Sequence, residues 1–267
     1  MTRKRRLAPG RGTPPAAGSH DARRGSAKGA AVPVGRPRGP QRVASPATGS
    51  AARKIDDAAV AAILAALHNL YPDARTELRH DNPLELLVAT ILSAQSTDQR
   101  VNEVTRELFR KYRTAADYAA ADPAVFEREI HATGFFRNKT KLVLGAARRL
   151  VETYGGRVPD TMEELVTLPG VARKTANVVL GSSFGKAEGV VVDTHVQRVA
   201  YRLGITLEED PPKIERELME RLPRDEWIFA GLGLILHGRR VCVARTPRCS
   251  ECLLARWCPR NGVTAAA

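Results

Sequence analysis

The sequence contains few cysteines, few aromatic residues and no long apolar run. Its 4 cysteines all lie in one short C-terminal stretch, which argues against a scaffold stapled by disulfides along its length. No stretch approaches the ~20 apolar residues of a membrane-spanning helix, so we expect no membrane partner. Aromatic residues make up only 5% of the 267 residues, yet 43% are hydrophobic, which suffices for a core of one or two domains.

Acidic residues are almost absent from residues 1–54, where thirteen Lys and Arg stand against Asp21 alone. Because the whole chain has a net charge of +13, residues 55–267 are close to neutral. The basic segment is rich in Pro, Gly, Ala and Ser, so it cannot bury enough apolar surface to offset its ordering entropy. We therefore expect a disordered basic tail, which either adds sequence-independent phosphate contacts or is a solvated extension without a role.

Strand patterns are also nearly absent. Val190–Val192 is the only strand-like run, and it is too short and solitary to build a sheet. From Ile55 onward, apolar residues recur at helical spacing, and the stretch from Leu84 to Leu92 is apolar all round, which predicts a buried helix. Helix boundaries are predicted at proline and glycine signals: Tyr71–Pro72, Asn82–Pro83, Asp122–Pro123 and Gly155–Gly156. The fold class predicted from these patterns is all-α.

The four cysteines follow the spacing C-x6-C-x2-C-x5-C, which is typical of a metal site: Cys242, Cys249, Cys252 and Cys258. Four thiolates can hold one tetrahedral zinc ion or a 4Fe-4S cubane. Structural zinc sites usually bring two tight C-x-x-C pairs, whereas a cubane accepts wider and unequal spacing. The spacing therefore favours the iron–sulfur cluster, and a zinc site stays open as the alternative.

The segment from Asp160 to Phe184 predicts a helix, a tight turn and a second helix. Pro169 sets the entry to the turn, and Gly170 supplies backbone freedom within it. The second helix then begins with unpaired N–H groups, and the positive end of its dipole favours an anion such as a phosphate. This is the helix-hairpin-helix pattern, although an ordinary corner between two helices has a similar sequence.

Two residues near this pattern are candidates for catalysis. Lys174 lies in the first turn of the second helix, where the helix dipole, Arg173 and partial burial would disfavour its charged form. A neutral amine is the form that Schiff-base chemistry requires, and the alternative interpretation is that Lys174 is a phosphate contact. Asp193 precedes another helical stripe and is either a helix N-cap or a carboxylate that stabilises positive charge on a sugar.

Four segments taken together resemble the endonuclease III family of helix-hairpin-helix DNA glycosylases: LPGVARKTANVV from Leu168, VDTH from Val192, LHGR from Leu236 and the four-cysteine run. The resemblance covers about residues 55–260. It implies an all-α fold with a six-helix barrel domain over residues 76–186, which contains the hairpin near 160–184. It further implies a helical cluster domain, made from residues 55–75 and 187–267, that holds one 4Fe-4S cluster through the four cysteines.

The resemblance also implies roles for single residues. Lys174 matches the family's nucleophile and Asp193 its catalytic carboxylate. Gln95 matches the residue that fills the vacated base stack, and Phe135 matches an intercalating wedge that is often aliphatic in the family. Further DNA contacts are implied at Leu168, Gly170, Val171, Ala172, Arg173 and His195. Ala172 stands where the family commonly has glycine, which alters one close approach of backbone to phosphate.

The implied function is bifunctional base-excision repair of double-stranded DNA, combining a glycosylase with an abasic-site lyase. The enzyme would remove oxidised pyrimidines and cleave the abasic site by β-elimination through a lysine Schiff base. Arginines beside the first two cysteines, at 239, 240, 245 and 248, would either contact DNA phosphates or balance an anionic cluster. We expect a monomer in the cytoplasm, associated with the nucleoid. The alternative hypothesis is that the basic tail targets an organelle, but its Pro and Gly residues oppose the amphipathic helix that such targeting segments form.

Two alternatives to this function stay open. A monofunctional mismatch or damage glycosylase shares the hairpin and the cluster but typically lacks lysine at position 174. A non-catalytic helix-hairpin-helix module that only binds DNA is the other, and the presence of both Lys174 and Asp193 argues against it.

Overall fold

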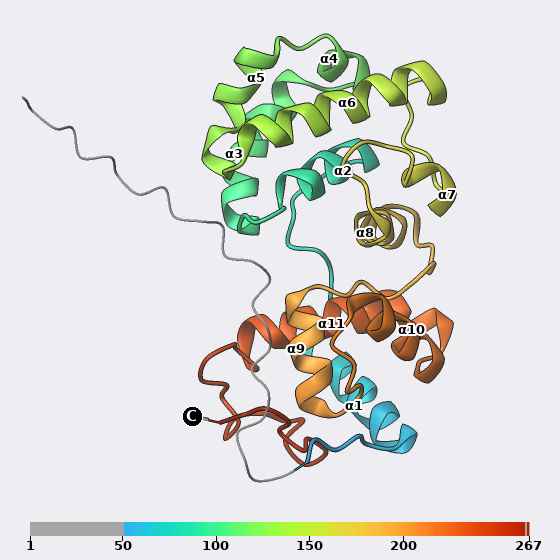
Figure 1. Cartoon of the computed structure of the whole chain (residues 1–267), viewed down its shortest axis with the longest axis vertical. Coiled ribbons are helices and arrows are strands. Elements are labelled where there is room, and N and C mark those ends of the chain that lie inside the picture. Colours follow the sequence, from blue (N-terminus) through green and yellow to red (C-terminus); the bar gives the residue numbers. More distant parts are fainter. Residues whose placement is uncertain (1–50, 265, 267) are drawn as a thin grey trace, which may run out of the picture. The chain divides into compact units, whose positions relative to one another are not determined.

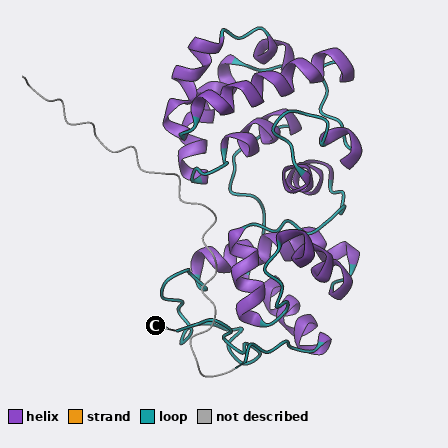
Figure 2. Cartoon of the chain, viewed as in Figure 1, coloured by secondary structure: helices purple, strands orange, loops and turns teal. Residues whose placement is uncertain are grey.

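The computed structural model describes residues 51–264 and residue 266 (Figure 1). Every regular element within these residues is a helix and none is a strand (Figure 2), which confirms the predicted all-α class. The predicted tail lies outside the described residues up to position 50. At its end, the Arg53 N–H donates to Asn261 Oδ1 at 3.0 Å, and Lys54 forms an ion pair with Glu217. Ordered contacts therefore begin before Ile55.

One apolar cluster is built from consecutive segments between Leu78 and Phe184. It takes side chains from α2 (Pro83–Leu92), α3 (Asp98–Lys111), α4 (Ala115–Ala119), α5 (Pro123–Ile130), α6 (Phe136–Tyr154), α7 (Met162–Leu165) and α8 (Arg173–Phe184). A 3-10 turn, η1 (His131–Thr133), joins α5 to α6. Residues 86–92 of α2 are all buried, as predicted for a helix that is apolar on every side.

A second apolar cluster joins segments that lie far apart in the sequence. Its helices are α1 (Asp57–Leu70), α9 (Thr194–Leu203), α10 (Pro211–Arg221) and α11 (Trp227–Arg240), with a 3-10 turn, η2 (Arg224–Glu226), before the last. Val60, Ile63 and Leu67 of α1 are buried against side chains of α9, α10 and α11. Val190 and Val192 enter this cluster from an irregular segment, so the strand-like run contributes buried side chains without forming a strand.

Helix boundaries fall where proline and glycine predicted them. α2 begins at Pro83, and the Oδ1 of its N-cap Asn82 accepts the Glu85 N–H at 3.0 Å. Asp122 caps α5 in the same way, and α6 ends at Gly155 in the left-handed conformation. These boundaries are confirmed. No helix of residues 51–264 is long and apolar enough to cross a membrane.

Candidate active site

The predicted hairpin turn links α7 to α8. The Val171 N–H donates to the Leu168 carbonyl at 3.1 Å, and Gly170 has a φ of 80°, in the left-handed region that favours glycine. A Cβ on Gly170 would lie 3.0 Å from the Cβ of Leu142. The turn therefore needs glycine both for its backbone conformation and for its close approach to α6.

The residues of the turn face in different directions. The side chains of Leu168 and Val171 are 2% and 5% exposed, so these two residues present only backbone groups to a ligand. Gly170, Ala172 and Arg173 are exposed. Ala172 is the N-cap of α8 and supplies no side-chain acceptor, so the first-turn N–H groups lack the usual capping partner. Together with the helix dipole, these donors make the start of α8 suited to an anion.

Lys174 extends from the first turn of α8 and is exposed. The partial burial expected from the sequence is therefore wrong. Its positive charge nevertheless acts on the carboxylate of Asp193, which lies 19 positions later in the chain. The fold thus brings together two side chains whose proximity their spacing did not establish.

Asp193 is the N-cap of α9 and is largely buried. Its Oδ1 accepts the N–H groups of His195 and Val196 at 2.8 and 2.9 Å, and its Oδ2 lies 3.0 Å from His195 Nδ1. Burial alone would raise the pKa of Asp193, but these hydrogen bonds and the charge of Lys174 outweigh it and hold the pKa below the ordinary aspartate value. The side chain is therefore an ionised carboxylate whose pKa is lowered in part by the charge of the exposed Lys174 amine.

The four cysteines line one small cavity together with Arg202 and His237. Arg202 Nη1 lies 3.5 Å from Cys242 Sγ, and the Arg260 N–H donates to Cys258 Sγ at 3.4 Å. Burial raises the pKa of the Cys258 thiol to about 11, so its thiolate requires a compensating positive charge. Within the described residues, no group of three or more His, Cys, Asp or Glu is arranged to hold a single metal ion.

Comparison with known proteins agrees with this geometry. The sequence profile of the HhH-GPD superfamily of base excision DNA repair proteins matches residues 88–224. The chain is 55% identical over 197 residues to the endonuclease III of Synechocystis sp., covering 74% of this chain and 90% of that enzyme. It is 45% identical over 191 residues to the endonuclease III of Bacillus subtilis, covering 71% and 87% of the two chains. The chain belongs to the endonuclease III family.

Solved structures give the same assignment. A non-covalent endonuclease III–DNA complex and a trapped endonuclease III–DNA covalent intermediate each superpose with a TM-score of 0.74 at 40% identity, covering 78% of this chain and 97% of theirs. The protein is therefore a base-excision repair enzyme of the endonuclease III type, a DNA glycosylase and abasic-site lyase. Membership in this family suggests a 4Fe-4S cluster.

Three exposed residues that are not glycine have left-handed backbones in the described part of the chain: Gln95, Phe135 and Arg260, the last with a φ of 59°. Gln95, between α2 and α3, has a φ of 55°, and Phe135, at the start of α6, has a φ of 47°. The Phe135 side chain is 59% exposed. A strained backbone at an exposed residue is often retained at a functional site. No sequence signal predicted either conformation.

A buried lysine supports the loop that carries Phe135. Lys139 is 2% exposed, and its Nζ donates to the Thr133 carbonyl at 2.7 Å. Burial lowers the pKa of Lys139. Sequence analysis missed this residue because a lysine in a helix is usually solvent-facing.

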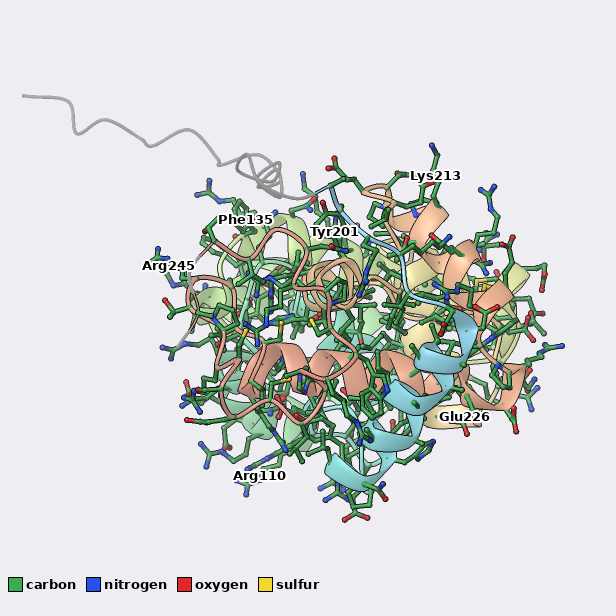
Figure 3. All side chains as sticks on the ribbon, turned by 90° about the horizontal axis from the view of Figure 1, so that it is seen from below. Arg110, Phe135, Tyr201, Lys213, Glu226 and Arg245 are labelled. Atoms are coloured by element: carbon green, nitrogen blue, oxygen red, sulfur yellow. The ribbon has the colours of Figure 1, made fainter. Side chains whose placement is uncertain are left out.

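The arginines near the cysteines divide into two groups. Arg239 forms ion pairs with Glu77 and with Asp98, whose Oδ2 lies 2.7 Å from Arg239 Nη1, and Arg240 pairs with Glu77 at 3.6 Å. Arg245 and Arg248 are exposed, and Figure 3 shows Arg245 at the edge of the molecule with its side chain pointing outward. Arg239 is therefore held by two carboxylates, whereas Arg245 and Arg248 lie exposed as either expected role, contact with DNA phosphates or balance of an anionic cluster, requires.

Proposed function

We propose that Lys174 is the nucleophile and Asp193 the catalytic carboxylate of a bifunctional glycosylase that removes oxidised pyrimidines from double-stranded DNA. The observation that carries this proposal is the electrostatic coupling of an exposed amine on α8 to an ionised, largely buried carboxylate on α9. A negative charge held there can stabilise the positive charge that develops on the sugar as the base departs. It can also assist proton transfers.

The chemistry balances on these two side chains. Lys174 first gives up a proton to water, and its amine then bonds to the sugar C1′ while the bond from C1′ to the base breaks and the base leaves with the electron pair. Loss of a proton from nitrogen and opening of the sugar give an imine. Removal of a C2′ proton then expels the 3′ phosphate by β-elimination. One lysine thereby performs both base removal and strand cleavage.

DNA contacts are proposed at the residues that the fold exposes. The free N–H groups at the start of α8, with the backbones of Gly170 and Ala172, are suited to a phosphate. Leu168 and Val171 shape the turn that presents them, since the Val171 N–H is bonded to the Leu168 carbonyl. Gln95 and Phe135 lie on exposed, left-handed loops, as befits residues that occupy a vacated base stack. We propose His195 as a further contact; its ring also orients the Asp193 carboxylate.

The cysteine cavity is proposed to hold one 4Fe-4S cluster through Cys242, Cys249, Cys252 and Cys258. Three observations support this proposal: all four cysteines line one cavity, the Arg202 guanidinium lies near Cys242 Sγ, and the Arg260 N–H donates to Cys258 Sγ. A bound cluster would supply the charge that stabilises the thiolates, and the four cysteines that would hold it all lie in the segment after α11. We further propose that the two apolar clusters correspond to a barrel domain and a cluster domain, and that the enzyme acts as a monomer on DNA in the cytoplasm.

Borohydride trapping tests the proposal. Wild type, Lys174→Ala and the matched control Lys213→Ala, which removes another exposed lysine, are each mixed with a duplex bearing thymine glycol and, separately, an abasic site. We expect a covalent adduct on both substrates with wild type and the control, and none with Lys174→Ala. An adduct on the abasic site alone would contradict the proposed substrate class. No adduct on either would favour a monofunctional glycosylase.

A further inference from the structure

Arg173, the neighbour of Lys174, is held by a carboxylate from another helix. Its Nε lies 3.0 Å from both Oε1 and Oε2 of Glu215, a residue of α10. Its Nη2 donates to the Glu188 carbonyl at 3.0 Å. Glu215 is only 12% exposed at its side chain, whereas that of Arg173 is 50% exposed. The guanidinium is thus anchored on one side, which limits its freedom to follow a DNA phosphate.

The same carboxylate holds a second residue of α8. Asn177, one turn beyond Arg173, is 4% exposed, and its Nδ2 donates to Glu215 Oε1 at 2.9 Å. The Oδ1 of Asn177 is buried and has no hydrogen-bond partner among the described residues, so within this part of the chain the side-chain amide bonds to Glu215 alone. A buried amide that depends on one acceptor costs free energy when that acceptor is removed.

The segment that leads to Asp193 passes directly over this network. Gly189 is buried, and a Cβ built on it would lie 2.0 Å from Glu215 Oε1 and 2.6 Å from Asn177 Nδ2. No side chain fits there unless the carboxylate moves. Gly189 is four residues before Asp193, and Glu188, which accepts from Arg173, is five residues before it. Glu215 therefore packs between the first turn of α8 and the backbone segment that leads to Asp193.

We infer that Glu215 is a positioning residue that sets the separation between Lys174 and Asp193 by binding Arg173 and Asn177 while the backbone at Gly189 closes over its carboxylate. This inference rests on the proposed function. The negative charge of Glu215 also offsets the guanidinium of Arg173, which reduces the repulsion between Arg173 and the adjacent Lys174. Glu215 does not touch the reacting atoms; it acts through the two elements that carry them.

The first test separates chemistry from binding. Glu215→Gln keeps the size of the side chain but removes its charge and its second acceptor, and Glu220→Gln makes the same change at an exposed position of α10. Single-turnover trapping on an abasic duplex reports chemistry, and affinity for a duplex with a tetrahydrofuran site, which cannot form an imine, reports binding. We expect Glu215→Gln to slow trapping about tenfold or more, since a 1 Å misplacement can cost on the order of 100-fold, with affinity nearly unchanged. The melting temperature should fall as well, because one remaining acceptor serves both Arg173 and Asn177. Glu220→Gln should match wild type.

A second test approaches the network from the backbone. Gly189→Ala should displace the Glu215 carboxylate and slow trapping to a similar degree. In a Glu215→Ala background the oxygen nearest the new Cβ is gone and only Asn177 Nδ2, at 2.6 Å, still has to shift, so Gly189→Ala should add less than it does in wild type. Such non-additivity is the signature of residues that act through one contact, and a loss caused only by general destabilisation would not produce it.

The outcomes distinguish the two claims. If wild type forms no adduct, the proposed function fails and the role of Glu215 falls with it. If wild type forms the adduct and Glu215→Gln forms it equally fast, only the role of Glu215 is refuted. The same refutation follows if affinity falls as far as the trapping rate, if Glu220→Gln is equally slow, or if the Gly189 and Glu215 changes are additive.

Discussion

Replacing Asp193 by asparagine or by alanine separates its two roles, the helix cap and the catalytic carboxylate. Asparagine caps helices about as well as aspartate, so Asp193→Asn can still accept the N–H groups of His195 and Val196. It loses the negative charge at the helix N-terminus, which contributes about 0.3–1 kcal/mol. Asp193→Ala loses that charge and also the cap, which contributes about 0.5–2 kcal/mol.

These magnitudes set the expected measurements. For a folded region of this size, 1 kcal/mol corresponds to about 2–4 °C in melting temperature. We expect Asp193→Asn to melt within a few degrees of wild type and Asp193→Ala to melt distinctly lower. Both should lose single-turnover cleavage of an oxidised-pyrimidine duplex to the same large extent, because both lack the carboxylate that stabilises charge on the sugar.

The comparison between the two variants shows whether Asp193 acts in catalysis, as a helix cap, or in both roles. An Asp193→Asn enzyme that cleaves within a few-fold of wild type would refute the catalytic role and leave Asp193 as a cap alone. Equal melting temperatures for the asparagine and alanine variants would instead refute the reasoning from the two backbone hydrogen bonds. His195→Gln serves as a control for the loss of the ring that contacts Oδ2.

Four further outcomes are expected. Because the pKa of Asp193 is held low in the folded state, wild type should melt at a higher temperature than Asp193→Asn at every pH above about 4, the ordinary aspartate pKa. This difference in melting temperature should disappear only as the pH falls through the lower pKa that Asp193 has in the folded state. Because burial lowers the pKa of Lys139, the unfolded chain binds more protons in the alkaline range, so wild type should gain stability relative to Lys139→Met as the pH rises toward the ordinary lysine pKa; parallel melting curves would contradict this. Cys258→Ser should lower the iron content per chain, the visible absorbance and the melting temperature, and zinc in the wild-type protein would contradict the cluster. Phe135→Ala should weaken flipping of a fluorescent base analogue, whereas Phe135→Leu should retain it, because an apolar wedge is sufficient.

The sequence predicted those features whose cause is local. Helix ends at Pro83, Pro123 and Gly155 follow from backbone chemistry within a few residues, and the hairpin follows from the φ that Gly170 permits. The family resemblance also identified Lys174 and Asp193 as candidates. Their coupling was beyond the sequence because it depends on how α8 and α9 pack.

Features with distant causes were missed. Glu215 lies on a helix with charged residues at most exposed positions, so nothing marks it as the partner of a residue 42 positions earlier. Arg173 was predicted as a DNA contact, and its anchoring by Glu215 follows only from packing. Leu168 and Val171 were predicted on the same surface, yet both side chains enter the core. A motif identifies a turn but does not say which side of it is buried.

The pairing of α1 with the last third of the chain has a consequence for synthesis. Residues 78–184 make their apolar cluster from consecutive helices, so this part can fold as soon as it has been translated, as domains generally do. Val60, Ile63 and Leu67, made earlier, belong to a cluster whose other helices and loops are made later, from residue 190 to residue 258. The apolar side chains of α1 therefore stay exposed until the C-terminal segments have been synthesised, and in this interval the growing chain is vulnerable to aggregation.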